Sequence, residues 1–337
     1  MRAAIISSPG KVEVTTVDDP QPGPGQVVVE VAACGICGTD LHILDGEFAP
    51  TLPVIPGHEF AGTVVAIGDV ATGAYVTELA IGQRVAVDPS LYCNECHYCR
   101  LGHNNLCEHW NAIGVSKPGG AAQFAVAPAA NCVPLPDGVR LEDAALIEPL
   151  SCAIRGYDVL SARMGAHVLI YGSGTMGLMM LQLAKLTGAA SVDVVDINPA
   201  RLRTAEALGC SATATSADEL DRPRGWEVVI DATGAGPAIQ DGLSRVAPAG
   251  TFLQFGVASY ATRVTIDPYR IYNKEITITG SMAVLHSFER AAELFVNGVL
   301  DPGVFISDRL PLEDYAEALD RFRRGEGRKI QVIPAGA

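Results

Sequence analysis

The sequence predicts an α/β protein that combines a barrel-like unit of short β-strands with a second unit built on a doubly wound parallel sheet. Three observations predict this fold class. Short apolar runs separated by proline and glycine occupy the chain up to about residue 150, where buried strands begin to alternate with helical segments. The length of 337 residues suits two domains, and an apolar fraction of 48% is enough to form a core in each.

The elements of the first unit are expected where short apolar runs lie between turns. The expected strands are residues 26–32, 60–67, 84–88 and 122–126. After Gly280 the pattern becomes irregular again, and we expect amphipathic helices at about 288–297 and 312–323 and a closing strand at 330–333. The two ends of the chain can therefore belong to one domain that the middle interrupts, although spacing alone does not establish this.

The middle of the chain is expected to form the parallel sheet. Its expected strands are residues 167–171, 191–195, 227–230 and 251–255, and its expected helices are 178–187, 199–208 and 237–246. The uncharged stretch 168–184 is as long as a short membrane span of about 17 residues. Three glycines interrupt it, so a strand, a turn and a buried helix explain it better.

Charge and cysteine content exclude several classes of function. The formal net charge is −14 at pH 7, and nucleic acid and anionic membrane surfaces both repel such a chain, so neither is an expected partner. The N-terminal residues lack the long apolar core of a secretory signal, which points to the cytoplasm. Nine unevenly spaced cysteines in that compartment indicate metal ligation rather than disulfides.

A glycine-rich turn follows the strand expected at 167–171. It consists of Gly172, Ser173, Gly174, Thr175, Met176 and Gly177, which matches the pattern G-x-G-x-x-G. The first glycine permits the tight turn, the second lets a pyrophosphate approach the backbone, and the third lets the helix pack closely on the strand. With Asp196 at the end of the next strand, this arrangement predicts dinucleotide binding; a glycine-rich loop without a ligand is the alternative.

Asp196 and the arginines that follow it bear on the choice of dinucleotide. A carboxylate at this position accepts hydrogen bonds from the adenosine ribose and repels a 2′-phosphate, so we expect NAD rather than NADP. Arg201 and Arg203 lie just beyond it. Arg201 is a candidate cofactor contact that would offset the repulsion, and an exposed helix face is the simpler explanation of both arginines.

Four cysteines fall within one short loop. They are Cys93, Cys96, Cys99 and Cys107. Four thiolates complete a closed tetrahedral zinc site, which leaves no position for a substrate, so we expect a structural zinc that holds the loop. An iron–sulfur cluster and free thiols are the alternatives, but the spacing to the fourth cysteine and the residue after it differ from the iron–sulfur pattern.

A less regular set of metal-ligating residues is spread over three segments. It comprises Cys37, His58 and the carboxylates Glu59 and Glu148. A catalytic zinc needs three protein ligands and one open position, and a cysteine, a histidine and a carboxylate supply them. Core packing and surface exposure are the alternatives for each residue taken alone. Cys34 and Cys37 also form a C-x-x-C pair that suits a redox role, although core packing is the default for Cys34.

Taken together, these motifs resemble those of the zinc-containing medium-chain alcohol dehydrogenases, and within them the sorbitol and polyol dehydrogenase branch. The resemblance covers essentially the whole chain and rests on Cys37-Gly-Thr-Asp, Gly57-His-Glu, Glu148-Pro-Leu, the four-cysteine loop and the glycine turn with Asp196. It implies a GroES-like β-barrel catalytic domain at 1–150 and 285–337, with a zinc lobe at 90–108, and a Rossmann NAD-binding domain at 151–284. It also implies a homo-oligomer, namely a tetramer.

The resemblance assigns ligands to a catalytic zinc. It implies that Cys37, His58 and Glu59 bind the metal, and that Glu148 lies beside it, bound directly or through a water. Cys152 lies four residues after Glu148 and shares a face with it if both are helical, which makes this cysteine a rival ligand. Glu59 and Glu148 are preferred to Cys152 as ligands because acidic residues occupy their positions in the sorbitol and polyol dehydrogenase branch.

Three more residues near Cys37 acquire roles from the resemblance. Asp40 would orient His58 from behind the metal. Thr39 would receive the proton of the substrate hydroxyl, and His42 would pass that proton outward. Such a set suits an alcohol whose acidity a bound zinc has raised.

The expected activity is the oxidation of a secondary alcohol, preferably a polyol such as sorbitol, arabitol or xylitol, to a ketone with zinc and NAD. Plain secondary-alcohol or threonine-type oxidation, an inactive cofactor-binding scaffold and a thiol-based sensor are the alternatives. One departure bears on the substrate, because residues 281–284 read Ser-Met-Ala-Val where animal-type sorbitol dehydrogenases carry an arginine–tyrosine pair. Phe48 and Trp110 are candidate apolar walls in its place.

Overall fold

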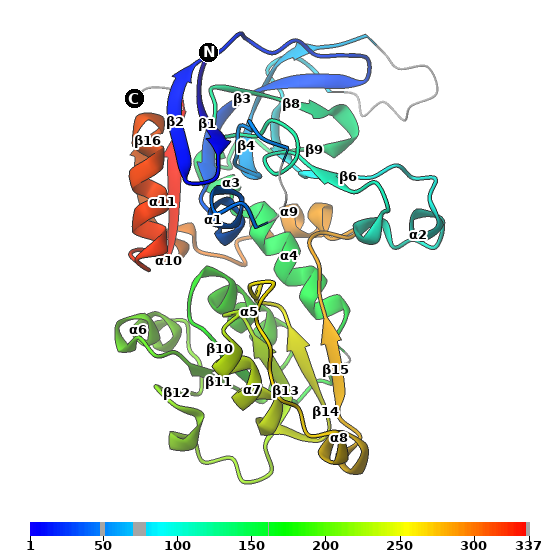
Figure 1. Cartoon of the computed structure of the whole chain (residues 1–337), viewed down its shortest axis with the longest axis vertical. Coiled ribbons are helices and arrows are strands. Elements are labelled where there is room, and N and C mark those ends of the chain that lie inside the picture. Colours follow the sequence, from blue (N-terminus) through cyan, green and yellow to red (C-terminus); the bar gives the residue numbers. More distant parts are fainter. Residues whose placement is uncertain (48–50, 70–78, 161, 335–337) are drawn as a thin grey trace. The chain divides into compact units, whose positions relative to one another are not determined.

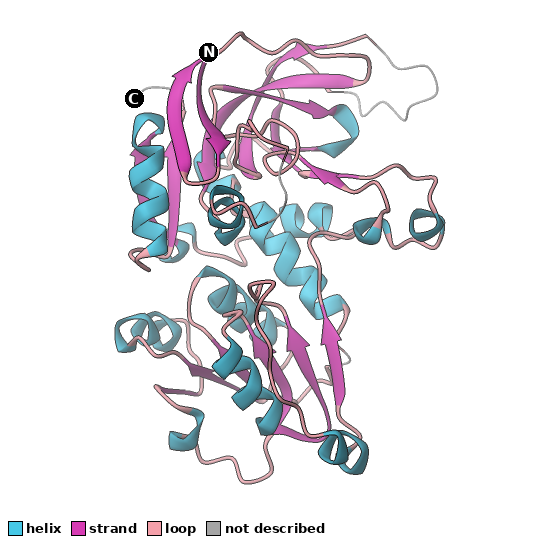
Figure 2. Cartoon of the chain, in the orientation of Figure 1, coloured by secondary structure: helices cyan, strands magenta, loops and turns pink. Residues whose placement is uncertain are grey.

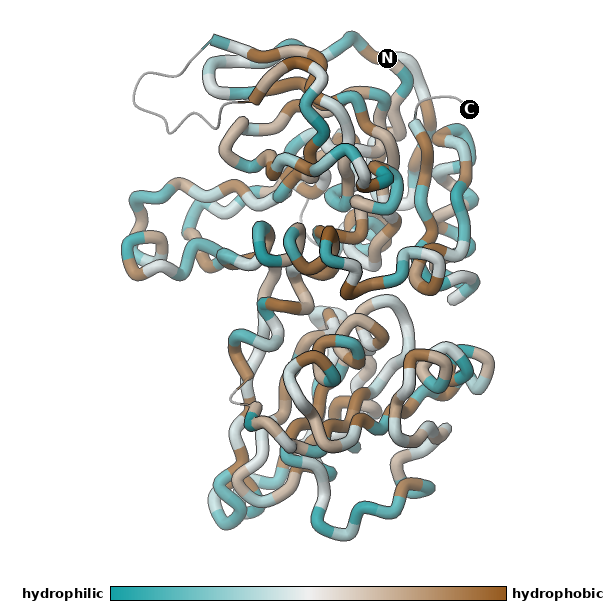
Figure 3. Tube along the Cα trace, turned by 180° about the vertical axis from the view of Figure 1, so that it is seen from behind, coloured by the Kyte–Doolittle hydropathy of each residue, from teal (hydrophilic) through white to brown (hydrophobic). Residues whose placement is uncertain are grey.

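The computed structural model describes residues 1–47, 51–69, 79–160 and 162–334 (Figure 1). The chain forms two compact units, one made of Met1–Ser151 and Val284–Ala337 and the other of Cys152–Ala283. Within each unit, hydrophobic stretches follow the strands and helices of its interior (Figure 3). Phe48, one of the two candidate apolar walls, lies outside the described residues.

The first unit is built on a seven-stranded sheet. Its order is β16-β17-β3-β4-β5-β9, and β8 also pairs with β3. Neighbouring strands are antiparallel except β16 and β17. The strands are β3 (Gln26–Gly35), β4 (Glu59–Ile67), β5 (Arg84–Val87), β8 (Phe124–Pro128), β9 (Cys132–Pro134), β16 (Ile306–Pro311) and β17 (Lys329–Ile333).

The C-terminal segment completes this unit. β17 pairs with β3, where Val332 lies opposite Cys34. Tyr315 and Ile330 are buried in the same hydrophobic core as Phe60. Figure 1 shows α11 (Tyr315–Arg323) beside β2 (Lys11–Thr16), although the two elements come from opposite ends of the sequence.

Shorter elements flank the sheet of the first unit. β1 (Arg2–Ser8) pairs with β2, and β6 (Ser90–Leu91) pairs with β7 (Asn111–Ala112). All four cysteines of the predicted zinc loop lie between β6 and β7, so this pair closes the base of the loop. The helices are α1 (Gly38–Leu44), α2 (His97–Arg100), α3 (Leu141–Ala144), α4 (Ile147–Asp158, which ends in the second unit), α9 (Phe288–Val296), α10 (Pro302–Phe305) and α11, and the 3₁₀ turns are η1 (Asn104–Leu106), η2 (Ala129–Asn131) and η4 (Leu312–Asp314).

The second unit is built on a six-stranded, all-parallel sheet. Its order is β12-β11-β10-β13-β14-β15. The chain therefore runs from β10 at the centre to the edge strand β12, returns to the centre at β13, and ends at the opposite edge strand, β15. This is the doubly wound order of dinucleotide-binding sheets, and the predicted fold class is confirmed. The strands are β10 (His167–Tyr171), β11 (Ser191–Val195), β12 (Ala212–Ala214), β13 (Trp226–Asp231), β14 (Val246–Gln254) and β15 (Thr277–Gly280), and the helices are α5 (Thr175–Leu186), α6 (Pro199–Ala207), η3 (Ala217–Glu219), α7 (Gly236–Arg245) and α8 (Pro268–Lys274) (Figure 2).

The uncharged stretch 168–184 is divided between β10, the glycine turn and α5. Most residues of α5 are buried inside the unit, which explains their apolar character without a lipid environment. No helix in the described ranges is long and apolar enough to cross a membrane.

The start of β14 departs from the expected pattern. The sequence predicts a helix through residue 246 and a strand from 251, whereas α7 ends at Arg245 and β14 begins at Val246. Pro248 cannot continue a helix and disfavours helical backbone in the residue before it. Ala249 follows with a φ of +58°, and the pairing of β14 with β13 is irregular near this point. The strand therefore begins early and becomes regular later.

Candidate active site and nucleotide-binding turn

The metal-ligating residues of the first unit meet where two elements begin. Cys37 directly precedes α1, and His58 and Glu59 stand at the start of β4. Ligand atoms of these three side chains all lie within 4.8 Å of one another. Gly57 makes this approach possible, because its φ is +91° and a Cβ there would collide with the sulfur of Cys34. The chain thus brings a thiol, an imidazole and a carboxylate to one point.

Asp40 links Cys37 to His58 from inside the protein. Its Oδ2 accepts a hydrogen bond from the backbone N–H of Cys37 at 2.9 Å. Its Oδ1 lies 3.9 Å from Nδ1 of His58, and both atoms are buried without a hydrogen-bond partner in the part of the chain that the structure describes. With Nδ1 turned toward a carboxylate, Nε2 is the ring nitrogen that remains for a cation.

The groups around His58 favour a positive charge at this point. Burial alone would lower the pKa of His58, but its hydrogen bond with Cys37 and the negative charges of Cys37, Asp40 and Glu148 outweigh burial and raise that pKa well above its usual value. Donors that attract a proton this strongly also attract a metal cation. The thiol, imidazole and carboxylate, with two orphaned buried polar atoms behind them, therefore fit a zinc ion.

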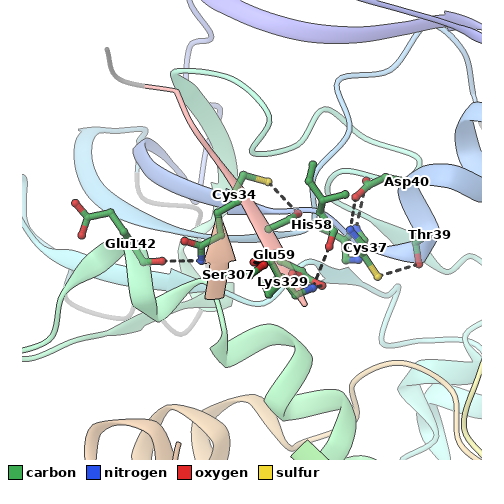
Figure 4. Close-up of polar contacts among 12 residues, drawn as sticks. Cys34, Cys37, Thr39, Asp40, His58, Glu59, Glu142, Ser307 and Lys329 are labelled. Atoms are coloured by element: carbon green, nitrogen blue, oxygen red, sulfur yellow. Dashed lines mark hydrogen bonds and ion pairs between the residues drawn. The ribbon is translucent and has the colours of Figure 1, made fainter. Parts of the chain in front are cut away.

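Lys329 is a member of this site that sequence reasoning missed. It begins β17, and its Nζ lies 2.7 and 2.6 Å from the two carboxylate oxygens of Glu59 and 3.0 Å from the carbonyl oxygen of Ile36. Both charged side chains are buried, and Figure 4 shows them side by side. Burial would lower the pKa of Lys329, but the charges of Glu59 and Cys37 outweigh burial and raise it, so the lysine remains charged.

This ion pair constrains Glu59. Each carboxylate oxygen already accepts a hydrogen bond from Lys329, and a Cβ at Gly35 would collide with Oε2, so the carboxylate is closely confined. A carboxylate oxygen has more than one lone pair, which lets a metal ion and the lysine share the same group. Any metal bound here therefore shares the carboxylate of Glu59 with Lys329, an internal cation.

Glu148 and Cys152 lie on α4 and outside the three-residue set. Glu148 is buried in the first turn of the helix, and its charge raises the pKa of both His58 and Lys329. Cys152 is half-buried. Because neither residue has a ligand atom in the group that lies within 4.8 Å, Glu59 is the third donor that the geometry offers.

Thr39 and His42 lie on α1, three residues apart and on one face. Thr39 Oγ1 is 3.7 Å from the sulfur of Cys37, a contact drawn in Figure 4. His42 Nδ1 is 2.5 Å from Oε2 of Glu47, and both of these side chains are partly exposed. The helix thus places a hydroxyl beside the ligand cluster and an imidazole nearer solvent.

The four cysteines form a second, closed cluster. Their sulfurs lie within 4.8 Å of one another, with 3.9 Å between Cys96 and Cys107 and 3.5 Å between Cys107 and Cys93. A tetrahedron with zinc–sulfur bonds of about 2.3 Å has edges of about 3.8 Å, which these distances match. Hydrogen bonds from backbone N–H groups, that of Cys99 first, lower the pKa of Cys96, whereas burial and the neighbouring thiols raise the pKa of Cys99. Cys96 is therefore the thiol of this pair that loses its proton first. Trp110, a candidate substrate wall, packs against this cluster.

The glycine turn joins β10 to α5. Gly172 has a φ of +96°, a left-handed conformation that favours glycine. Gly174 precedes α5, and the space beside its Cα is open, which lets a phosphate approach the helix N-terminus. A Cβ at Gly177 would collide with the carbonyl oxygen of Gly172, so the turn requires its third glycine. Thr175 and Met176 form the first turn of the helix, where backbone N–H groups have no helical acceptor.

Asp196 binds the glycine turn itself, a contact that sequence reasoning missed. Its Oδ2 accepts hydrogen bonds from the backbone N–H and the hydroxyl of Ser173, both at 2.8 Å, and its Oδ1 accepts one from the backbone N–H of Asn198 at 2.8 Å. A carboxylate offers about four acceptor positions, so capacity for a ribose hydroxyl remains. Arg201 and Arg203 follow on α6, the first partly buried and the second exposed.

Known proteins resemble this chain over nearly its whole length. Residues 23–137 match the family described as "Alcohol dehydrogenase GroES-like domain", and residues 175–297 match "Zinc-binding dehydrogenase". D-arabinitol dehydrogenase 1 of Uromyces fabae is 34% identical over 99% of this chain and 97% of its own length. An L-threonine 3-dehydrogenase of Mesorhizobium japonicum is 31% identical over 92% of each chain. A crystal structure from Sinorhizobium meliloti 1021, described as a zinc-binding dehydrogenase bound to NADP, is 34% identical, covers 99% of both chains and has a TM-score of 0.92.

Proposed function

This chain belongs to the zinc-binding alcohol dehydrogenases, a family of oxidoreductases, and from that premise we propose that it oxidises a polyol at a secondary hydroxyl to a ketone, with a nicotinamide dinucleotide as hydride acceptor. The observation that carries this proposal is the convergence of Cys37, His58 and Glu59 within 4.8 Å, with the hydroxyl of Thr39 beside them. Removal of an alcohol proton needs a Lewis acid next to a proton acceptor, and this cluster offers both positions.

Two zinc ions with different roles are part of the proposal. Cys37, His58 and Glu59 would hold the catalytic ion and leave one coordination position open, with Glu148 close by. The four-cysteine cluster would hold a structural ion with no open position. When bound, the catalytic ion stabilises negative charge on an alcohol oxygen, and the dinucleotide receives the two electrons.

The residues of α1 handle the proton. Thr39 accepts the proton of the substrate hydroxyl and releases its own toward His42, which lies one turn farther along the helix. His42 is partly exposed and paired with Glu47, so the proton leaves toward solvent. Asp40 is buried and takes no part in this transfer; it keeps the ring of His58 oriented.

NAD is the proposed dinucleotide. Asp196 supports it, because its negative charge lies beside the glycine turn and repels a 2′-phosphate. The NADP in the similar Sinorhizobium meliloti structure makes NADP the competing outcome. Comparison of kcat/KM for the two dinucleotides decides between them, and a higher value with NADP rejects this assignment.

A polyol is proposed in preference to a simple alcohol because Glu148 adds a second buried carboxylate near the ligand cluster, beyond Glu59, whose oxygens are already bonded to Lys329. A carboxylate accepts a hydrogen bond from a second hydroxyl of the substrate. A site that makes this hydrogen bond discriminates strongly against analogues that lack the hydroxyl. The similarity to D-arabinitol dehydrogenase 1 supports the same class. Threonine-type oxidation is the second candidate, supported by the similarity to L-threonine 3-dehydrogenase.

The decisive experiment compares kcat/KM for C4 to C6 polyols, vicinal diols, 2-alkanols and L-threonine. We expect the polyols to exceed the 2-alkanols by tenfold or more, about 1.4 kcal/mol of transition-state stabilisation. His58→Ala supplies the background rate, and Thr39→Val tests the proton acceptor with the metal ligands intact. A tenfold preference for 2-alkanols rejects the polyol assignment, and a preference for L-threonine transfers the proposal to the second candidate.

A cytoplasmic homotetramer completes the proposal. β15 is an edge strand of the described sheet, and exposed Tyr269 and Tyr272 on α8 add apolar surface on which a second copy can pack. None of the nine cysteines, all of which lie within the described residues, forms a disulfide, a state that a reducing compartment preserves. Size-exclusion chromatography with light scattering measures the assembly, and a monomer at micromolar concentration rejects it.

A further inference from the structure

A cavity lined by basic residues lies in the unit Cys152–Ala283. Its volume is about 560 Å³, within the range of about 300–1,000 Å³ of small-molecule sites. One acidic side chain, Asp221, lines it against five basic ones. The basic residues are Arg222, Arg224, Arg245, Arg270 and Lys274. In a chain of net charge −14, this concentration of positive charge needs a physical reason.

The cavity lies at the N-terminal ends of the parallel strands, whereas the glycine turn lies at their C-terminal ends. Two of its lining residues, Trp226 and Val246, are the first residues of β13 and β14, whereas the glycine turn follows the last residue of β10. In a parallel sheet the two ends of the strands are separated by the strand length, which for a strand of six residues is about 20 Å. A dinucleotide at the carboxyl ends of the strands therefore leaves this cavity for another ligand.

Only part of the positive charge is neutralised within the protein. Arg245 bonds two carboxylates, and Arg222 lies 3.7 Å from the carboxylate of Asp193. Across the described residues, Arg224, Arg270 and Lys274 make no ion pair with a carboxylate. Three cations therefore line the cavity with no carboxylate partner among the described residues, so the cavity presents a net positive charge that favours an anionic ligand.

Two of the arginines are already held in fixed positions. The terminal nitrogens of Arg270 donate to the carbonyl oxygens of Leu243 and Val246 at 2.8 and 2.6 Å, at the C-terminal end of α7. Arg222 donates from Nη2 to Ser191 Oγ at 3.0 Å, while its Nε is buried and has no acceptor among the described residues. A guanidinium has five N–H donors, so both side chains keep unused donors in a preset orientation.

We propose that this cavity binds a small phosphate ester, of the size of a nucleoside monophosphate, as a ligand separate from the dinucleotide. A guanidinium group donates two parallel hydrogen bonds to two oxygens of one phosphate. The exposed Arg224 and Lys274 add positive charge in the same cavity. Leu220, Pro223 and Pro248, which also line the cavity and are not buried, give the organic part of the ligand an apolar surface. Neither the proposed substrate nor the glycine turn enters this assignment.

Adenosine 5′-monophosphate is the probe for a calorimetric titration. The protein is first saturated with NADH, the reduced form of the proposed dinucleotide, so that the glycine turn is occupied. The titration is then run at low and at high salt. We expect one site per chain, with an affinity that falls as salt rises because cations bind the phosphate. Arg224→Gln with Lys274→Gln should weaken binding at least tenfold, since both residues are exposed and without an ion-pair partner in the described chain.

Arg263→Gln is the matched control, because Arg263 is an exposed arginine of the same unit outside the cavity. It should bind the probe as the parent does. Absence of binding to the dinucleotide-saturated protein overturns the proposal, because the probe then uses only the glycine turn. Binding of equal strength to the double variant also overturns it, because the phosphate then lies elsewhere.

Discussion

Replacing Lys329 with methionine would leave the carboxylate of Glu59 buried without its counter-ion. The two residues are 3% and 1% exposed, and their charged atoms are 2.6 and 2.7 Å apart. Breaking a buried ion pair by removing one partner costs about 3–5 kcal/mol. In a unit of roughly 200 residues, 1 kcal/mol shifts Tm by about 2–4 °C, so we expect Lys329→Met to lower Tm by about 6–20 °C.

Differential scanning calorimetry before and after metal chelation measures this effect. A bound cation replaces the charge of Lys329 beside Glu59, so the loss should be smaller in zinc-loaded protein and larger after chelation. The pKa of Lys329 is raised above the ordinary lysine value of 10.5, so its stabilising contribution is fully present below that pH and is lost only as pH rises through the higher value. The Tm difference should therefore be the same at pH 6 and pH 9.

Two control variants separate the ion pair from other effects. Lys11→Met removes an exposed lysine that lies 4.0 Å from Glu13, and a pair of this kind contributes at most about 1 kcal/mol. Glu59→Gln combined with Lys329→Met removes both charges and should be more stable than Lys329→Met alone. A fall in Tm for chelated Lys329→Met no larger than that of the Lys11→Met control would refute the predicted effect of the ion pair.

Three more predictions concern the metals and the turn. Cys99→Ser should lose about one zinc per chain and have a lower Tm. His58→Ala should lose the other zinc and its catalytic activity but keep its circular dichroism spectrum. Elemental analysis measures the zinc content of both variants, and an unchanged content in either one contradicts the assignment. Asp196→Ala should narrow the NAD preference in kcat/KM by about tenfold, about 1.4 kcal/mol, and an unchanged ratio would show that another residue sets it. Gly177→Ala should weaken dinucleotide binding at least tenfold in a fluorescence titration, because its Cβ collides with the carbonyl oxygen of Gly172; binding equal to the parent would contradict that close approach.

The parallel sheet could be predicted because its signals are local. The expected strands 167–171 and 191–195 coincide with β10 and β11, since each is a short apolar run that ends at a glycine or an acid. The expected helix 312–323 is instead a 3₁₀ turn, η4, followed by α11 from Tyr315. Amphipathic spacing does not distinguish a tight first turn from an α-helical one.

The contacts that refine the site could not be predicted, because they join distant parts of the chain. Lys329 and Glu59 are 270 residues apart, and a lysine at the start of an apolar strand gives no indication of its partner. The spacing of Asp196 from the glycine turn predicts a ribose contact, but it gives no indication of the hydrogen bonds that Asp196 accepts from Ser173. Chemistry at a position is local information, whereas pairing depends on the folded topology.

The interruption of the first unit by the second sets an order of assembly during synthesis. Residues 152–283 are contiguous, so that unit can fold as soon as it leaves the ribosome. The first unit has to wait for β17, which brings Lys329 to Glu59 and Val332 to the strand beside Cys34. At about 5–20 residues per second, the roughly 50 residues after Val284 take about 3–10 s to synthesise. The nascent chain therefore completes residues 152–283 while the carboxylate of Glu59 still lacks its counter-ion.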